Sequence, residues 1–357
     1  MQKNFFRFSV FALLTLVSFF SDHTFADICT FNGNTTISVD CENGTISDAD
    51  STITINSGVT LKAQRTMVDA NINITSFINN GFINGGTSHS GAFKASANNT
   101  IGTFINNGDV YFNGWKAFWI TNDPTAENFS GNHGTFSNTG TWRSNGSKAF
   151  HNDKGTTWTS FTNSGNFEAK GPDSFYLQGS GSIGTLTNSG TFTTNGDRSF
   201  HLDSDYTITN FINSGTWALG ASGAKLEGTI TTLTNTGTIS GTFKNSGAIS
   251  TLSNQGTISD TLNNSGTITT LTNSENGTIS TLTNTGTISG TFNNSGALTT
   301  LTNQGTISDT LNNSGAITTL TNSENGTIST LTNTGTISGT LNNSGAITTL
   351  TNSENGT

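Results

Sequence analysis

A short unit, Leu-x-Asn-x-Gly-x-Ile, recurs through the second half of the chain and restricts its fold more than any other feature. The unit is clear from Leu233 and continues through Phe243 and Leu252 to the end of the sequence. Unit glycines lie 9 to 11 residues apart, and the five steps from Gly237 to Gly286 span a block of 49 residues that recurs almost unchanged. A unit of about ten residues cannot bury an apolar face alone, so the units must stack as a solenoid.

Within each unit, apolar residues and Asn occupy alternate positions, and Thr or Ser fills the positions between them. This period of two predicts a β-strand with one buried face. The Asn-x-Gly centre predicts a corner, because Gly adopts a positive φ without strain and Asn tolerates it better than most residues. Asn side chains stacked at these corners are expected to form an amide ladder.

Between residues 77 and 232 the same motif returns at longer intervals. The starting residues lie 27, 32, 25, 25 and 25 residues apart, and they are Phe77, Phe104, Phe136, Phe161, Leu186 and Phe211. A second apolar residue follows each start by 14 to 16 residues, which predicts three short strands per coil of an all-β solenoid. Stacking of the second apolar residues predicts an internal aromatic ladder of Phe93, Phe118, Phe150, Phe175 and Phe200.

The coil size in residues 233–357 is open, because coils of two units (about 20 residues) and of three units (about 30 residues) both fit the pattern. Three units are preferred, since they keep a three-sided cross-section continuous with the preceding region. About eleven coils then give a rod of roughly 50 Å, at ~4.8 Å per coil.

The N-terminus has the layout of a secretory signal peptide. Lys3 and Arg7 precede an uncharged apolar run at residues 8–20, and small residues flank a predicted cleavage point after Ala26. Both cysteines, Cys29 and Cys41, follow shortly, and export to an oxidising compartment favours a disulfide between them.

Four segments result. They are a signal peptide at 1–26, an N-terminal cap with the Cys29–Cys41 loop and the first β-helix strands at 27–76, an aromatic-rich β-helix with coils of about 25 residues at 77–232, and a Thr/Ser/Asn/Gly stalk of ten-residue units at 233–357.

The composition fits a thin continuous core and disfavours two compact domains. Only 31% of the 357 residues are hydrophobic and 10% are charged, against about 45–50% and ~25% in ordinary domains. A disordered Ser/Thr/Asn/Gly tract is the alternative, and the strict placement of Leu and Ile argues against it. The net charge of -9 makes nucleic acid an unexpected partner.

The sequence contains no GxSxG elbow, HExxH motif or P-loop. Acidic residues are sparse and dispersed, whereas hydrolases and lyases need clustered acids and bases. We therefore expect a protein that is not an enzyme, with no catalytic residue, no cofactor and no metal site.

One outward column is a candidate ligand-binding site. The residues that follow the inward Phe of successive coils are expected to point outward and to stack roughly 5 Å apart; they are Trp119, His151, Tyr176 and His201, flanked by Lys94 and Glu227. Aromatic rings and imidazoles on a surface suit sugar or protein recognition. The alternative is that bulky side chains stack on one another without a ligand. The two histidines, near 10 Å apart, are too distant to share a metal.

A signal peptide followed by Asn- and Gly-rich β-repeats of the NSGTI and NxGT(F/W) kind resembles the passenger region of bacterial autotransporters, especially repeat-rich passengers related to the vacuolating-cytotoxin-like group. The likeness covers most of residues 27–357. It implies a right-handed parallel β-helix that is exported to the cell surface or the extracellular space and acts in adhesion or host interaction. It also implies an outer-membrane β-barrel C-terminal to the sequence given, so we expect a fragment that stops inside a repeat.

The resulting expectation is an adhesin whose partner is a glycan or protein of a host cell or its matrix, with binding in 27–232 and a stalk in 233–357. The alternative is a structural spacer that displays an effector region beyond Thr357. A third possibility is an ice-binding Thr array on residues such as Thr234, Thr236 and Thr238, although units of unequal length break the spacing that such arrays need.

Overall fold

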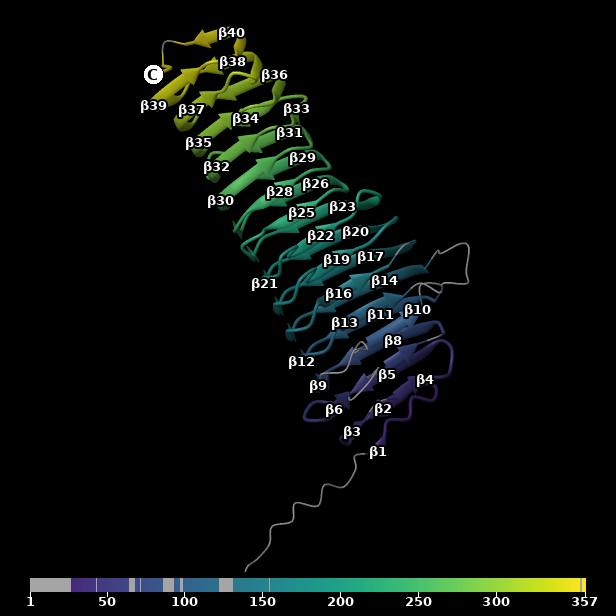
Figure 1. Cartoon of the computed structure of the whole chain (residues 1–357). Coiled ribbons are helices and arrows are strands. Elements are labelled where there is room, and N and C mark those ends of the chain that lie inside the picture. Colours follow the sequence, from purple (N-terminus) through teal and green to yellow (C-terminus); the bar gives the residue numbers. More distant parts are fainter. Residues whose placement is uncertain are drawn as a thin grey trace, which may run out of the picture.

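The computed structural model describes residues 27–357, apart from residues 43, 64–67, 71, 86–92, 97–98, 122–130, 154 and 354. The described residues form an all-β parallel β-solenoid of about 13 turns, which confirms the predicted fold class, and they include no helix. Strands β1 (Asp27–Ile28) and β40 (Ala346–Asn352) lie at opposite ends of the rod (Figure 1). The predicted signal peptide lies outside the described residues. In the described part of the chain, no helix is long and apolar enough to cross a membrane.

Each strand pairs in parallel with the equivalent strand of the next coil, so that strands stack into faces along the rod. The first face comprises β2 (Thr35–Ile37), β5 (Ser51–Ile55), β8 (Ile74–Asn79), β11 (Ile101–Asn106), β14 (Gly131–Asn138), β17 (Thr156–Asn163), β20 (Gly181–Asn188), β23 (Tyr206–Asn213), β26 (Thr229–Asn235), β29 (Ala248–Asn254), β31 (Thr267–Asn273), β33 (Thr287–Ile288) with β34 (Phe292–Asn294), β36 (Thr306–Asn313), β38 (Thr327–Asn333) and β40.

Two further faces complete the coils up to Asn245, which we call the three-sided region. The second comprises β1, β3 (Cys41–Glu42), β6 (Thr60–Ala63), β9 (Phe82–Gly85), β12 (Asp109–Phe112), β15 (Thr141–Ser144), β18 (Asn166–Ala169), β21 (Thr191–Thr194), β24 (Thr216–Leu219) and β27 (Thr238–Ser240). The third comprises β4 (Gly44–Ile46), β7 (Val68–Ala70), β10 (Phe93–Ser96), β13 (Lys116–Thr121), β16 (Lys148–Asn152), β19 (Phe175–Leu177), β22 (Phe200–Leu202), β25 (Ala224–Leu226) and β28 (Phe243–Asn245).

The second and third faces merge at β30 (Thr257–Asn264). Ile258 of this strand pairs with Ile239 of β27, and its Leu262 pairs with Phe243 of β28. Beyond β30 the merged face continues in single strands, which are β32 (Thr278–Asn284), β35 (Ala297–Asn303), β37 (Ala316–Asn322) and β39 (Thr336–Asn343). Each coil of this region therefore has two sides, one of which is divided into β33 and β34 in a single coil.

The preference for three units per coil in residues 233–357 was therefore wrong. Two units make a coil, and stacked Asn residues lie 19 to 21 residues apart there, against 22 to 32 in the three-sided region. The core explains the change, because Phe and Trp give way to Ile and Leu as the large inward side chains. Two sheets can then face each other across about 10 Å without a third wall. The smaller coil leaves room for more turns, and 13 turns at ~4.8 Å give a rod of about 60 Å.

Two columns of Phe fill the three-sided region. The rings of the third-face column, Phe93, Phe118, Phe150, Phe175 and Phe200, lie parallel with successive centroids 4.8 to 5.1 Å apart. A first-face column contains Phe77, Phe104, Phe136 and Phe161 at spacings of 4.6 to 5.2 Å. Rings of the two columns meet edge to face, as in the pair of Phe118 and Phe136 at 5.3 Å. The core is thus a continuous aromatic stack.

Buried Asn ladders line the corners along the rod. Each side-chain Nδ2 donates to the Oδ1 of the Asn one coil further on, at 2.7 or 2.8 Å, from Asn79 through Asn188 to Asn352. A second ladder starts at Asn245 and reaches Asn343. The Oδ1 of Asn245 has no hydrogen-bond partner, because its neighbour in the preceding coil is Leu226. Elsewhere the ladder satisfies amides whose unpaired burial is costly.

The corner glycines have a different cause from the one expected. The unit glycines, such as Gly190 and Gly215, are absent from the residues with a positive φ. A Cβ on Gly190 would instead overlap the carbonyl oxygen of Gly165 in the preceding coil. Glycine is therefore required here because successive coils approach each other closely, and not because the backbone needs a positive φ.

At the N-terminal end of the rod, Cys29 and Cys41 form a disulfide with their Cα atoms 5.3 Å apart. Both residues are buried, and β1 pairs with β3 beside them. The bridge covalently closes the first coil at the edge where the stack of strands begins.

Candidate ligand-binding strip

Strand register places five of the six candidate residues in one column on the outside of the third face. Lys94 pairs with Trp119, and the column continues through His151 and Tyr176 to His201. We call these five residues the outer column.

Glu227 is not in the outer column, and its assignment to it was wrong. The residue that pairs with His201 is Lys225, and Leu226 pairs with Leu202, so that Ala224 takes the rung expected for an inward aromatic ring. The reason is that the step to β25 is one residue shorter than the 25-residue coil. Glu227 still reaches the column from the next corner, with its Oε2 3.3 Å from His201 Nε2.

The rings of the outer column stack face to face. Centroid distances are 6.5 Å from Trp119 to His151, 5.2 Å from His151 to Tyr176 and 4.5 Å from Tyr176 to His201, with planes within 14° of parallel. His151 and His201 are buried, whereas Trp119 and Tyr176 are half-buried. Because the ring faces contact one another, a ligand would meet the ring edges and the charged groups around them.

Charged side chains that sequence reasoning missed cover this column. They stand two residues before the inward Phe of each coil, and they are Lys116, Lys148, Asp173 and Arg198. Lys116 Nζ lies 3.4 Å from the centroid of Trp119, and Lys148 Nζ lies 4.2 Å from that of Tyr176, which are cation–π distances. The recurrence of charge at one offset was visible in the sequence and could have identified the set.

Burial lowers the pKa of two groups at the N-terminal end of the strip. It lowers the pKa of Lys116 from 10.5 to about 8, despite the nearby Asp153 carboxylate. Burial also lowers the pKa of His151. For Asp153 burial acts in the raising direction, but hydrogen bonds from His151 and Trp119 and the charge of Lys116 outweigh it and hold the pKa at about 2.

Trp115 is the most exposed aromatic ring beside the column, at 47%. Its centroid lies 6.4 Å from that of Trp119, and Lys116 Nζ lies 4.5 Å from it. Trp119 is half-buried in the outer column, and the remaining described tryptophans, Trp142, Trp158 and Trp217, are buried in the core. Trp115 thus gives the strip an indole that solvent reaches.

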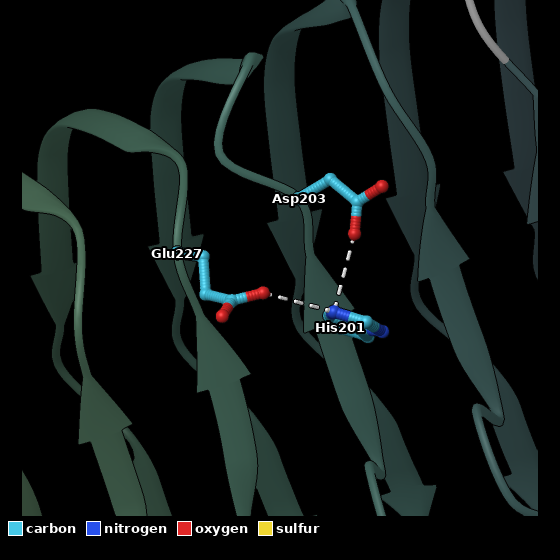
Figure 2. Close-up of side chains that lie close together, drawn as sticks. All are labelled: His201, Asp203 and Glu227. Carbon is cyan, nitrogen blue, oxygen red and sulfur yellow. Dashed lines mark hydrogen bonds and ion pairs between the residues drawn. The ribbon is translucent and has the colours of Figure 1, made fainter.

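At the upper end of the strip, which is the end toward the C-terminus, three carboxylates surround His201. Asp203 Oδ1 lies 3.2 Å and Glu227 Oε2 3.3 Å from His201 Nε2. Figure 2 shows both carboxylates directed at the imidazole. On the other side of the ring, Asp173 Oδ1 lies 3.4 Å from Nδ1, and Asp173 is paired with Arg198.

Comparison with protein-family models, curated proteins and solved structures found no match to this chain. The fold defines the class, a parallel β-solenoid.

Proposed function

We propose that this chain is the rod of an exported, surface-exposed adhesin that recognises a glycan or protein of a host cell or its matrix. In this proposal the strip formed by the outer column, Trp115 and the surrounding charges is the binding surface. The resemblance of the repeats to autotransporter passengers suggests export and adhesion, and the rod geometry suits display away from a cell.

One observation carries the proposal: four stacked rings with two lysine ammonium groups against them lie on one face of an otherwise polar rod. Aromatic and cationic groups in this density are typical of recognition surfaces. Trp115, with its exposed indole, is the residue that a sugar ring can contact most directly.

The test is a quadruple Ala variant of Trp115, Trp119, Tyr176 and Lys148 in the full chain, measured for binding to cells and to a glycan array. The matched control replaces the outward residues of the adjacent second face in the same coils, namely Tyr111, Arg143, Glu168 and Thr193. We expect the first variant to lose at least about tenfold in binding and the control to keep it. Equal binding by the two folded variants would remove the strip as the site.

The stalk offers a second candidate function, that of a spacer. Residues 229–352 carry two unbroken Asn ladders and one Lys or Arg, Lys244, so that repeat number changes length with little change in surface chemistry. This part suits a spacer that sets the distance between an anchor and a binding region.

A further inference from the structure

We infer that His201, Asp203 and Glu227 bind a divalent transition-metal ion of the Zn²⁺ class at the upper end of the strip. The three residues come from β22, the turn after it and the corner after β25 in the next coil (Figure 2). One ligand atom from each lies within 4.8 Å of the other two. Such an ion goes beyond the proposed adhesin function, because it would bind whether or not the strip recognises a host molecule.

The distances match a tetrahedral ion site. Zn²⁺ binds His nitrogen and carboxylate oxygen at about 2.0–2.1 Å, which places two ligand atoms of a tetrahedron about 3.3 Å apart. His201 Nε2 lies 3.2 Å from Asp203 Oδ1 and 3.3 Å from Glu227 Oε2. A single Nε2–H cannot donate well to both carboxylates, whereas an ion between the three atoms satisfies all of them.

The other side of the imidazole is arranged as it is at histidine metal sites. Ligating histidines usually direct their second ring nitrogen at a carboxylate, which fixes the tautomer and the ring orientation. His201 Nδ1 is buried without a hydrogen-bond partner, and the nearest carboxylate oxygen is Asp173 Oδ1 at 3.4 Å. Arg198 pairs with that carboxylate. Its Nε lies 2.6 Å from Oδ1, and its Nη2 donates to Oδ2 at 2.7 Å. Tyr176 stacks on the ring at 4.5 Å and fixes its plane.

Asp203 is also oriented for the task. The backbone N–H of Gly179 donates to its Oδ2 at 2.8 Å, and the hydroxyl of Tyr176 donates to the same oxygen at 3.3 Å. The remaining oxygen, Oδ1, is the one aimed at His201. The side chains of Asp203 and Glu227 are 24% and 37% exposed, so solvent can supply a fourth ligand and an entry path.

The ligand set selects the kind of ion. One imidazole nitrogen with two carboxylates suits Zn²⁺ and its transition-metal neighbours, while Mg²⁺ and Ca²⁺ prefer sites made of oxygen alone. Lys225 competes with the ion, because its Nζ lies 2.9 Å from Glu227 Oε2. The ammonium has to leave that oxygen when an ion binds.

The same column contains a natural contrast at His151. Its Nε2 lies 3.0 Å from Asp153 Oδ1, but the remaining neighbours are the Gln178 amide oxygen at 3.0 Å and the Lys148 ammonium at 3.4 Å. Where His201 has a second carboxylate, His151 has the Gln178 amide, and the Lys148 ammonium already lies beside its Nε2. The metal site is therefore expected at His201 and not at His151.

The experiment is a calorimetric titration of the full chain with ZnCl₂ after removal of metal by a chelator, with MgCl₂ as the contrasting probe. We expect wild type to bind one Zn²⁺ that H201Q loses, and D203N and E227Q to weaken that binding by at least about tenfold. D153N is the matched control and should leave this binding unchanged, while K225M should tighten it. Replacement of Zn²⁺ by Co²⁺ should give the intense visible absorption of a tetrahedral site.

The thermal melt of each variant checks the fold, and E227Q changes a carboxylate that is 37% exposed. Zn²⁺ binding that is equal in wild type, E227Q and D203N would overturn the inference. So would the absence of any Zn²⁺ binding to wild type at concentrations of about 1 mM. Neither result would bear on cell or glycan binding, which the Ala variants of the strip test separately.

Discussion

At the scale of single residues, the buried Asn and Phe ladders stabilise the rod in different ways. Asn188 accepts from Asn163 and donates to Asn213 Oδ1 and to the carbonyl oxygen of Thr216, while Phe150 stacks between two rings of its ladder. N188A removes hydrogen-bond partners from buried groups, at a cost of about 1–3 kcal/mol. F150A leaves a cavity and should cost about 3–5 kcal/mol in unfolding free energy.

Urea unfolding of both variants measures this ranking. The control is N107A, because Asn107 is exposed and makes the same kind of amide hydrogen bond between successive coils, donating to Asn80 Oδ1 at 2.8 Å. That variant should change the unfolding free energy by less than about 0.5 kcal/mol. A larger loss for N188A than for F150A would show that the amide ladder, and not the aromatic stack, dominates stability.

His133 makes the fold sensitive to acid. Burial lowers its pKa from 6.5 to about 4, and its Nδ1 accepts a hydrogen bond from the backbone N–H of Ile101. The folded state therefore binds this proton less readily than the unfolded state, and stability should fall by roughly 3 kcal/mol as pH drops from about 6.5 to about 4. The carboxylate of Asp153, with a pKa of about 2, loses its contribution at lower pH, below about 4.

The variant H133N isolates this effect, because its amide oxygen can accept from Ile101 and does not titrate in this range. Urea unfolding at several pH values should show a flatter pH dependence for H133N than for wild type between pH 4 and 6.5. Parallel curves for the two proteins would assign the acid sensitivity to other groups.

At the scale of strands and coils, the corner glycines control how closely coils approach. G190A places a Cβ against the carbonyl oxygen of Gly165, which belongs to the backbone and has no room to move aside. We expect a loss of at least about 2 kcal/mol, as for other overpacked sites. S189A changes the neighbouring exposed residue of the same corner and should be close to neutral. A thermal melt of each variant gives the comparison.

The strands and both ladder types followed from the sequence because they depend on local pattern. Alternating apolar residues, Asn at fixed offsets and Phe at 25-residue intervals each determine which side chains face inward and which stack. Coil size in the second half did not follow, because every ten-residue unit offers the same edge to its neighbours and the pattern fits two or three units equally. The narrower Ile and Leu core, a tertiary property, decided the number.

The candidate site, like the fold, was predictable from the sequence only in part. The outer column from Lys94 to His201 followed from the inward Phe column, but Glu227 was misplaced because one coil is a residue shorter than the others. The burial of His151 and His201 was missed, since the charges that cover them come from the preceding residues and from the next coil. Strand register determines which side chains of neighbouring coils meet. A coil that is one residue shorter or longer changes this register.

At the scale of the whole molecule, the sequence repeat and the structural repeat are out of phase. A block of 49 residues holds five units and each coil uses two, so one block makes two and a half coils. The identical segments Thr278–Asn284 and Thr327–Asn333 accordingly lie on different sheets, in β32 and β38. Both sheets accept the same sequence, and the stalk presents the same chemistry on opposite faces.

This phase relation predicts how the rod responds to changes in repeat number. Insertion of four additional copies of residues 282–330 adds ten coils, which at ~4.8 Å per coil lengthens the rod by about 48 Å. Coils of three units would instead add about 32 Å, a difference that electron microscopy of single rods can resolve. Because each copy joins at an identical position, the melting temperature should not fall. Binding should also be unchanged, since the strip lies in the coils before the insertion, and loss of binding would move the site into the stalk.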